Sequence, residues 1–255
     1  MFKRSFMLAL VALFATQVMA TIVPYDTVYN ADQLPDLYNG GTLLDAKTIS
    51  IQQEALVDIG GGNKAWEAKS TWVANGTYVE SKNGVYNPKL GVYSSIEFRL
   101  KITAQPNPAY EAMQIFVGDD QSQTTGKWKV RGFMFASNYI VETGALPGGQ
   151  GTKVTFDTAT DFVTYKLNYK SSTATADLYY YNGTDWSYLL SSSVGRDFTG
   201  NPTTLYSRFR LGDDTGTNYL GTYQVDYIAW NQVPEPATIC LLGLGFLAFR
   251  KRTGC

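Results

Sequence analysis

Apolar and charged residues alternate without a break in the stretch Ile96-Glu97-Phe98-Arg99-Leu100-Lys101-Ile102. Successive side chains of an extended strand point to opposite faces, so this stretch has one apolar face and one charged face. The same alternation recurs in Val163–Tyr169 and Leu205–Leu211. Further strand candidates are Ala112–Val117, Lys127–Ala136, Ala174–Tyr181 and Thr222–Trp230. We therefore expect many strands that each bury one face.

Turn signals separate these strands at short intervals. Asn-Gly pairs, which favour tight hairpins because positive φ suits both residues, occur at Asn75-Gly76, Asn83-Gly84 and Asn182-Gly183. Between the two ends of the chain no stretch keeps a 3.6-residue apolar period for three turns, and the only helix candidates are the short segments Ala31–Tyr38 and Asp157–Ala159. Many strands with tight turns predict an all-β protein, an antiparallel sandwich of two sheets.

Three segments resemble the concanavalin A-like (laminin-G-like) jelly rolls. Val57-Asp58 followed by Gly60-Gly61-Gly62-Asn63-Lys64 resembles the early hairpin of that fold. Asp177–Trp186 is similar to its late hairpin, and Tyr223–Trp230 resembles its closing strand, often written V-D-Y-I-x-W. The resemblance implies one jelly-roll β-sandwich domain over residues 21–232.

The N-terminus has the layout of a secretory signal peptide. Lys3 and Arg4 precede an apolar run from Phe6 to Val18, and small residues lead up to Thr21. We expect residues 1–20 to be removed by cleavage between Ala20 and Thr21. The alternative, a membrane helix, is weaker because the run is short and polar, strand-like sequence follows at once.

The C-terminus combines a Pro-x-Pro signature, an apolar run and a basic stop. Pro234-Glu235-Pro236 precedes Ile239–Phe249, and Arg250-Lys251-Arg252 follows. This order resembles the PEP-CTERM tail, which an exosortase recognises in Gram-negative bacteria with exopolysaccharide-rich envelopes. The resemblance implies an apolar sorting helix in residues 233–255, processing by exosortase, and a final place on the cell surface, the outer envelope or the extracellular matrix.

The tail is better suited to transient membrane insertion than to permanent anchoring. The 13 residues from Ala237 to Phe249 are fewer than the number, about 20, that spans the hydrocarbon layer. We therefore expect the tail to contact the inner membrane only transiently.

The composition of the remaining segment excludes several function classes. Residues 21–232 hold 16 basic and 21 acidic residues, a net charge of about −5, so a nucleic-acid partner is not expected. Both cysteines, Cys240 and Cys255, lie in the tail, and the chain has no histidine. Ser-His-Asp and Cys-His catalysis and the usual zinc sites are therefore excluded, and no disulfide can stabilise this segment.

The sequence favours a non-catalytic role. Glucan-cleaving enzymes of the concanavalin A-like fold carry a Glu-x-Asp pair on one strand, and the related lyases use a histidine; this chain has neither. We expect Glu97, Asp157 and Asp161 to be solvated or turn residues. Two alternatives stay open: a polysaccharide-active hydrolase or lyase with an unrecognised site, and a purely structural matrix protein.

Aromatic residues are the candidates for glycan binding, because their rings stack against sugar faces. Tyr179 and Tyr181 should share one face of their strand, and Trp186 follows the Asn-Gly turn. These three are the predicted glycan-binding residues, whereas Trp66 and Trp128 are expected in the core. The predicted ligand is an extracellular polysaccharide or another glycan.

A structural calcium ion is the only cofactor that the sequence offers. Related jelly rolls hold calcium through the closing-strand aspartate and oxygens of the N-terminal segment, which implies Asp226 with Asp26 and Asp45. The turns Asp119-Asp120 and Asp213-Asp214 also carry paired carboxylates, which calcium prefers. The alternative for these turns is that they only end strands and keep them soluble.

Overall fold

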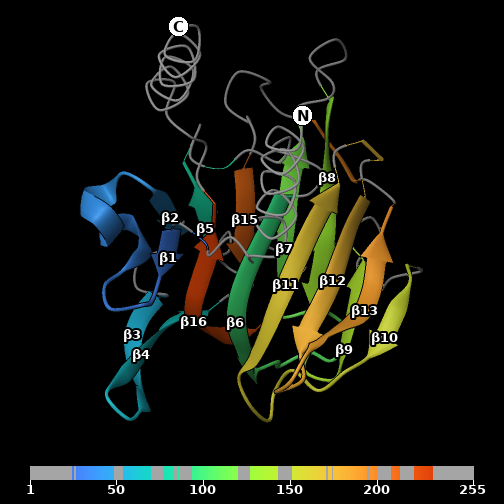
Figure 1. The fold of residues 1–255 in the computed structure, drawn as a ribbon. Helices are drawn as coiled ribbons and strands as arrows, with labels where there is room; N and C mark the ends of the chain where they lie inside the picture. The colour runs from blue at the N-terminus through green and yellow to red at the C-terminus, as the bar shows by residue number, and fades with distance from the viewer. Residues whose placement is uncertain are drawn as a thin grey trace, which may run out of the picture.

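The computed structural model shows two antiparallel sheets packed face to face (Figure 1). The structure describes residues 25, 27–48, 54–69, 77–82, 86, 94–119, 127–142, 151–170, 172–173, 175–193, 196–199, 208–212 and 221–231. The signal segment, the sorting tail and the turns Asn75-Gly76 and Asn83-Gly84 lie outside these residues. Within the described part of the chain, no helix is long and apolar enough to cross a membrane.

Sheet A has eight strands in the order β13-β12-β11-β6-β16-β4-β3, with β1 paired to β16. Its strands are β1 (Thr27–Tyr29), β3 (Glu54–Gly60), β4 (Asn63–Lys69), β6 (Ser94–Ala104), β11 (Val163–Lys170), β12 (Thr175–Tyr181), β13 (Trp186–Ser192) and β16 (Thr222–Trp230). The long strands β6 and β16 lie side by side near its middle (Figure 1).

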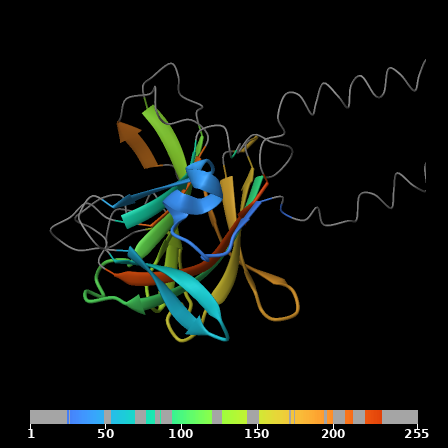
Figure 2. The ribbon, with the colours of Figure 1, turned by 90° about the vertical axis from the view of Figure 1, so that its left-hand side faces the viewer.

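Sheet B also has eight strands, in the order β10-β9-β8-β7-β15-β5-β2, with β14 paired to β8. Its strands are β2 (Leu44–Thr48), β5 (Thr77–Ser81), β7 (Met113–Asp119), β8 (Lys127–Phe135), β9 (Tyr139–Glu142), β10 (Lys153–Thr155), β14 (Arg196–Thr199) and β15 (Arg208–Gly212). A short 3₁₀ helix, η1 (Pro35–Gly41), lies with the β3–β4 hairpin at one end of the sandwich (Figure 2).

The alternation in the stretch 96–102 produces the core. Ile96, Phe98 and Leu100 are fully buried, whereas the charged residues between them are half-buried on the outer face of sheet A. The ring of Phe98 stacks on Tyr165 of the same sheet at 5.4 Å and meets Phe135 of sheet B edge-on at 6.0 Å. The two sheets therefore share one aromatic-rich core, which includes Trp66 as expected; the side chain of Trp128 is not among the described ones.

The expected strands are confirmed where the structure describes them. Thr222–Trp230 has the predicted bounds, and the helix candidate at Ala31–Tyr38 overlaps η1. The helix candidate at Asp157–Ala159 is wrong. That segment is a turn in which Asp157 Oδ1 accepts hydrogen bonds from the backbone amides of Ala159 and Thr160, at 2.9 and 3.0 Å. A short aspartate side chain competes with the helix for backbone donors, which explains the difference.

Candidate functional site

The hairpin β12–β13 is fixed by its Asn-Gly turn. Asn182 Oδ1 accepts hydrogen bonds from the backbone amides of Thr184 and Asp185, both at 2.9 Å, and Gly183 has a φ of +97° that a side chain would strain. The turn places Tyr181 directly opposite Trp186. The prediction of a tight turn at this Asn-Gly pair is thus confirmed.

Four aromatic rings lie on the outer side of this hairpin. The pairs are Tyr181 with Trp186, whose ring centroids are 5.6 Å apart, and Tyr179 with Tyr188, at 5.7 Å. Tyr181 and Tyr188 are 43% and 57% exposed, whereas Leu178 on the opposite side of the strand is fully buried. We call these four rings the aromatic hairpin face. It contains all three predicted glycan-binding residues.

A lysine supports this face from the neighbouring strand. Lys166 of β11 pairs in register with Tyr179, and its Nζ lies 3.8 Å from the centroid of the Trp186 ring. Such a cation over an aromatic ring is an attractive contact. Burial lowers the pKa of Lys166, with Glu97 opposing that shift. The contact therefore restrains the indole ring.

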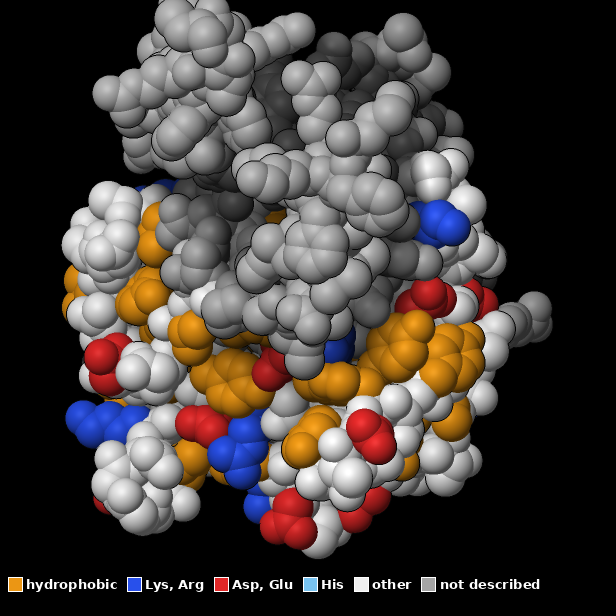
Figure 3. All heavy atoms as spheres, in the orientation of Figure 1, with side chains coloured by type: hydrophobic (Ala, Val, Ile, Leu, Met, Phe, Trp, Pro, Cys, Tyr) orange, Lys and Arg blue, Asp and Glu red, His pale blue; other side chains and the backbone are white. Residues whose placement is uncertain are grey.

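Polar side chains continue the surface next to the rings. Ser191 Oγ donates to Asp177 Oδ1, and the hydroxyls of Ser191 and Tyr188 are 2.9 Å apart. On the adjacent strands Ser95 Oγ donates to Asn168 Oδ1 at 2.7 Å. Figure 3 shows hydrophobic side chains gathered over β12 and β13, with acidic and basic groups around them. The surface thus offers ring faces together with hydrogen-bonding groups.

Tyr188 and Lys166 were not among the residues predicted from the sequence. Tyr188 could have been found by counting outward from the Asn-Gly turn, because the pairing of Tyr181 with Trp186 puts Tyr188 opposite Tyr179. Lys166 depends on the register of β11 against β12, which no turn motif in the sequence specifies.

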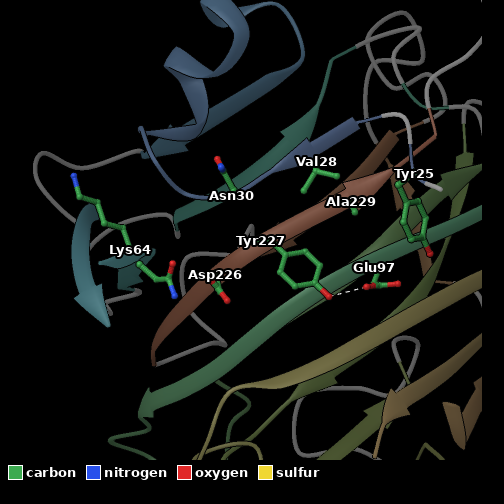
Figure 4. Close-up of a pocket in the computed structure, with 9 residues that line it drawn as sticks. Tyr25, Val28, Asn30, Lys64, Glu97, Asp226, Tyr227 and Ala229 are labelled. Atoms are coloured by element: carbon green, nitrogen blue, oxygen red, sulfur yellow. Dashed lines mark hydrogen bonds between the residues drawn. The ribbon is translucent and has the colours of Figure 1, made fainter. Parts of the chain in front are cut away.

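A cleft of about 490 Å³ opens on the same outer face of sheet A, at the side of β1 (Figure 4). It is lined by Tyr25, Val28, Asn30, Asn63, Lys64, Glu97, Asp226, Tyr227 and Ala229. These residues come from β1 and the residues on either side of it, from the start of β4, and from β6 and β16.

A β-bulge shapes this cleft. The register of β16 against β6 shifts between Val225 and Tyr227, so Asp226 is an extra residue in its strand. As a result Asp226 and Tyr227 are both on the outer face, while Val225 and Ile228 on either side are fully buried. Bulges re-aim side chains in this way and are frequent next to functional sites.

Both carboxylates of the cleft already have partners. The Tyr227 hydroxyl donates a hydrogen bond to Glu97 Oε1 at 2.6 Å (Figure 4). Asp226 forms an ion pair with Arg99 at 2.6 Å. Burial, and then the nearby Glu97 carboxylate, raise the pKa of Tyr25 and of Tyr227, so both phenols stay protonated. Glu97 was expected to be a solvated residue; instead it is half-buried between two tyrosines.

The described part of the chain holds no group of three or more Asp, Glu, His or Cys side chains that could bind a metal ion. Asp226 is paired with Arg99, Asp45 lies on β2 of the other sheet with its side chain undescribed, and Asp26 lies outside the described residues. Thr27, the residue after Asp26, pairs with Trp230 on β16 and not with Asp226. Calcium takes six to eight oxygen ligands, so the calcium site stays a prediction.

The acidic turns cannot be compared with their prediction. The backbone of Asp119 ends β7, but its side chain is not described, and Asp120, Asp213 and Asp214 lie outside the described residues.

The C-terminal segment matches a known sorting signal over residues 232–252, described as the PEP-CTERM protein-sorting motif. The chain carries a PEP-CTERM motif. This motif contains Pro234, Glu235 and Pro236, and it indicates an exosortase-sorted protein that is exported to the surface or the extracellular space of Gram-negative bacteria. No curated protein matches the sequence.

Several solved structures are similar to this chain. A carbohydrate esterase from the Shiga toxin-encoding bacteriophage phi24B is similar at 13% identity and a TM-score of 0.51, over 80% of this chain and 100% of that one. Peanut lectin matches at 12% identity and a TM-score of 0.47, over 81% of this chain and 96% of the lectin. An endo-1,3-β-glucanase from Streptomyces sioyaensis matches at 11% identity and a TM-score of 0.44, over 80% of this chain and 94% of the glucanase. The two antiparallel sheets themselves confirm the predicted jelly-roll sandwich, and at these identities the likeness to solved structures concerns the fold alone.

Proposed function

We propose that this exported protein binds glycan without cleaving it, through the aromatic hairpin face. The observation that carries the proposal is the set of four rings on adjacent strands, two of them 43% and 57% exposed. A contiguous group of exposed apolar side chains often marks a binding site, and the faces of aromatic rings match the C–H surfaces of sugars. The ligand in this proposal is an extracellular polysaccharide.

The rings are held ready for such a ligand. Trp186 is fixed by Lys166, and Tyr188 by the hydroxyl of Ser191. Neither ring needs much ordering when a sugar arrives, which lowers the entropic cost of binding. Hydroxyl and carboxylate groups beside the rings supply hydrogen bonds to a sugar.

The proposed division of the chain into three segments is consistent with this role. Residues 1–20 form the signal peptide, 21–232 the jelly-roll domain, and 233–255 the sorting tail. Export and sorting bring the domain to the outer envelope or the matrix, where polysaccharide is the abundant partner. A structural calcium ion at Asp226 belongs to the same proposal and is tested separately.

The second candidate function is polysaccharide cleavage in the cleft. It is favoured by two carboxylates, Glu97 and Asp226, on neighbouring strands of one cleft. Against it, Asp226 is neutralised by Arg99, and Glu97 accepts a hydrogen bond from the Tyr227 hydroxyl. The third candidate, a matrix protein without ligand, predicts neither binding nor cleavage.

A paired assay on the purified full chain separates these candidates. Retention on immobilised polysaccharides and release of reducing sugar from the same polymers are measured together. We expect retention without release. Release that disappears in Glu97→Gln would support the hydrolase, and absence of both activities would support the structural role.

Variants of the exposed rings test the site itself. Tyr181→Ala and Tyr188→Ala should weaken retention with unchanged circular dichroism, because both rings point into solvent. Leu37→Ala is the matched control, since Leu37 is 57% exposed on η1, away from the hairpin. Unchanged retention in the double tyrosine variant would contradict the proposal.

A further inference from the structure

The cleft beside β1 is separate from the aromatic hairpin face. In sheet A the strands β6 and β16 carry the cleft, β12 and β13 carry the rings, and β11 lies between them. No residue is shared by the two surfaces. The cleft therefore needs an explanation of its own.

Three local distortions of the backbone meet at this cleft. The bulge at Asp226 is the first. Ala31, between the lining residue Asn30 and Asp32, has a φ of 53° although it is a fully buried non-glycine residue. The positive-φ glycines 60–62 then lead directly into Asn63. Left-handed backbone at a non-glycine residue costs free energy and is concentrated at binding sites.

Each distortion directs a polar side chain to the rim. Figure 4 shows Asn30, Lys64 and Asp226 on three segments around the opening that are far apart in the sequence, with the Lys64 side chain extending outward from the rim. A smaller cavity of about 190 Å³ adjoins this rim and is lined by Asn30, Asp32, Gly62, Asn63 and Lys64. The opening is thus surrounded by amides, carboxylates and one lysine.

The interior of the cleft is largely apolar. Val28 is 47% exposed there, next to Ala229 and the rings of Tyr25 and Tyr227. A volume of about 490 Å³ is in the range of small-molecule sites, and an apolar wall with a few convergent polar groups is their usual composition.

The charges select the class of ligand. Asp226 and its ion-pair partner Arg99 neutralise each other, and Glu97 and Lys64 add one charge of each sign, so the lining has no net charge that favours an anion or a cation. Amides, which donate and accept hydrogen bonds, and carboxylates, which accept them, lie beside an apolar wall and fit a molecule with hydroxyl groups on one side and C–H groups on the other. An uncharged sugar ring has that arrangement.

We propose that this cleft binds a single uncharged pyranose residue, such as the end of a glycan chain, as a site distinct from the aromatic hairpin face. The apolar wall of Val28, Ala229 and the tyrosine rings takes the C–H face of the sugar. Asn30, Asn63 and Lys64 hydrogen-bond to its hydroxyl groups at the rim.

The test is titration of the purified full chain with glucose, galactose, mannose and xylose, and with glucuronate and glucosamine as charged comparators. Calorimetry or ligand-observed NMR should show saturable binding of at least one uncharged sugar and weaker binding of its charged counterpart. Asn30→Ala and Lys64→Ala should each weaken binding by about two- to tenfold, the range for one hydrogen bond. The exposed matched controls, Asn138→Ala and Lys69→Ala, should bind as the wild type does.

A variant that fills the cleft tests the site without relying on the loss of a single hydrogen bond. Val28→Trp fills the cleft from an exposed position and should abolish sugar binding, while Leu37→Trp on η1 should not. Absence of saturable binding in the wild type, preference for a charged sugar, or unchanged binding in Val28→Trp would each overturn the inference.

The two binding proposals fail in different ways. Tyr181→Ala with Tyr188→Ala should lose polysaccharide retention and keep monosaccharide binding, whereas Val28→Trp should lose monosaccharide binding. Loss of monosaccharide binding in the tyrosine variant but not in Val28→Trp would refute the cleft and leave the hairpin proposal standing. Retention that survives the tyrosine variant would refute the hairpin proposal alone.

Discussion

Replacing Glu80 with Gln should be among the most destabilising conservative changes in this protein. Glu80 lies on β5 with its side chain 1% exposed. Its Oε1 is 2.6 Å from Nη1 of Arg208, and its Oε2 is 2.7 Å from Nη2 and 3.0 Å from Nε of Arg210. The guanidinium of Arg210 also lies 4.2 Å from the centroid of the Tyr78 ring. One carboxylate therefore compensates two largely buried cations.

The expected cost follows from that arrangement. Glutamine keeps the volume and one acceptor oxygen, but it removes the charge that balances the two arginines. Breaking a buried ion pair by removing one partner costs about 3–5 kcal/mol. The side chains of Arg208 and Arg210 are 16% and 13% exposed, so water can solvate part of their charge and reduce the free-energy cost. We expect about 3 kcal/mol, which for a protein of this size lowers the melting temperature by about 6–12 °C.

Thermal unfolding followed by circular dichroism, together with urea titration, measures this effect. The matched control is Glu67→Gln, because Glu67 is a half-buried residue on β4 that can keep its hydrogen bond from Gln224 Nε2. The control should change the unfolding free energy by no more than about 0.5 kcal/mol. A melting temperature of Glu80→Gln equal to that of the control would refute the reasoning.

Four further predictions concern pH, calcium, sorting and cross-links. Burial raises the pKa of the Glu111 carboxyl above its ordinary 4.5, so the folded state holds a proton that the unfolded chain has released, and stability should fall as the pH rises from about 4.5 upward; urea titrations of Glu111→Gln should lack this fall. If calcium binds at Asp226, a chelator should lower the melting temperature of the wild type, in free-energy terms by RT ln(1 + [L]/Kd), and Asp226→Ala should abolish the response; an unchanged wild type would eliminate calcium. Mass spectrometry of the envelope fraction should find a chain that starts near Thr21 and lacks Cys240 and Cys255; recovery of an intact Arg250–Cys255 peptide would contradict sorting by cleavage. A reducing agent should leave the melting temperature of that mature chain unchanged, because residues 21–232 contain no cysteine; a lower value would be inconsistent with this expectation.

The strands were predictable where burial on one face leaves a period-2 pattern. β6 and β11 alternate strictly, and their buried and outer residues follow that alternation. β5 has no such pattern, because all five of its residues are buried. β10 has only three residues, too few for a period to be recognised.

The aromatic hairpin face was partly predictable because its geometry is local. The turn at Asn182-Gly183 fixes the pairing of β12 with β13, so neighbours across the hairpin follow from the sequence by counting. Lys166 belongs to a different strand pair, β11 with β12, and its contact with Trp186 spans three strands. Such a contact depends on the register of β11 against β12 and on that of β12 against β13. Only the second register is specified by a turn motif, at Asn182-Gly183.

The cleft could not be predicted, because it depends on departures from regular geometry. Strict alternation through Val225-Asp226-Tyr227-Ile228 would place Tyr227 on the buried face with Val225 and leave Ile228 outside. Ile228 is the more apolar residue, and the bulge at Asp226 lets it be buried while Tyr227 turns outward to Glu97. The register shift thus satisfies the core, and the displaced tyrosine becomes a wall of the cleft. Packing against the second sheet determines where the register of β16 shifts. In a regular strand the same residues would form no cleft. Deletion of Asp226 should therefore remove the bulge and reshape the cleft while Val225 and Ile228 stay buried, whereas Asp226→Asn should keep the bulge and weaken only the ion pair with Arg99.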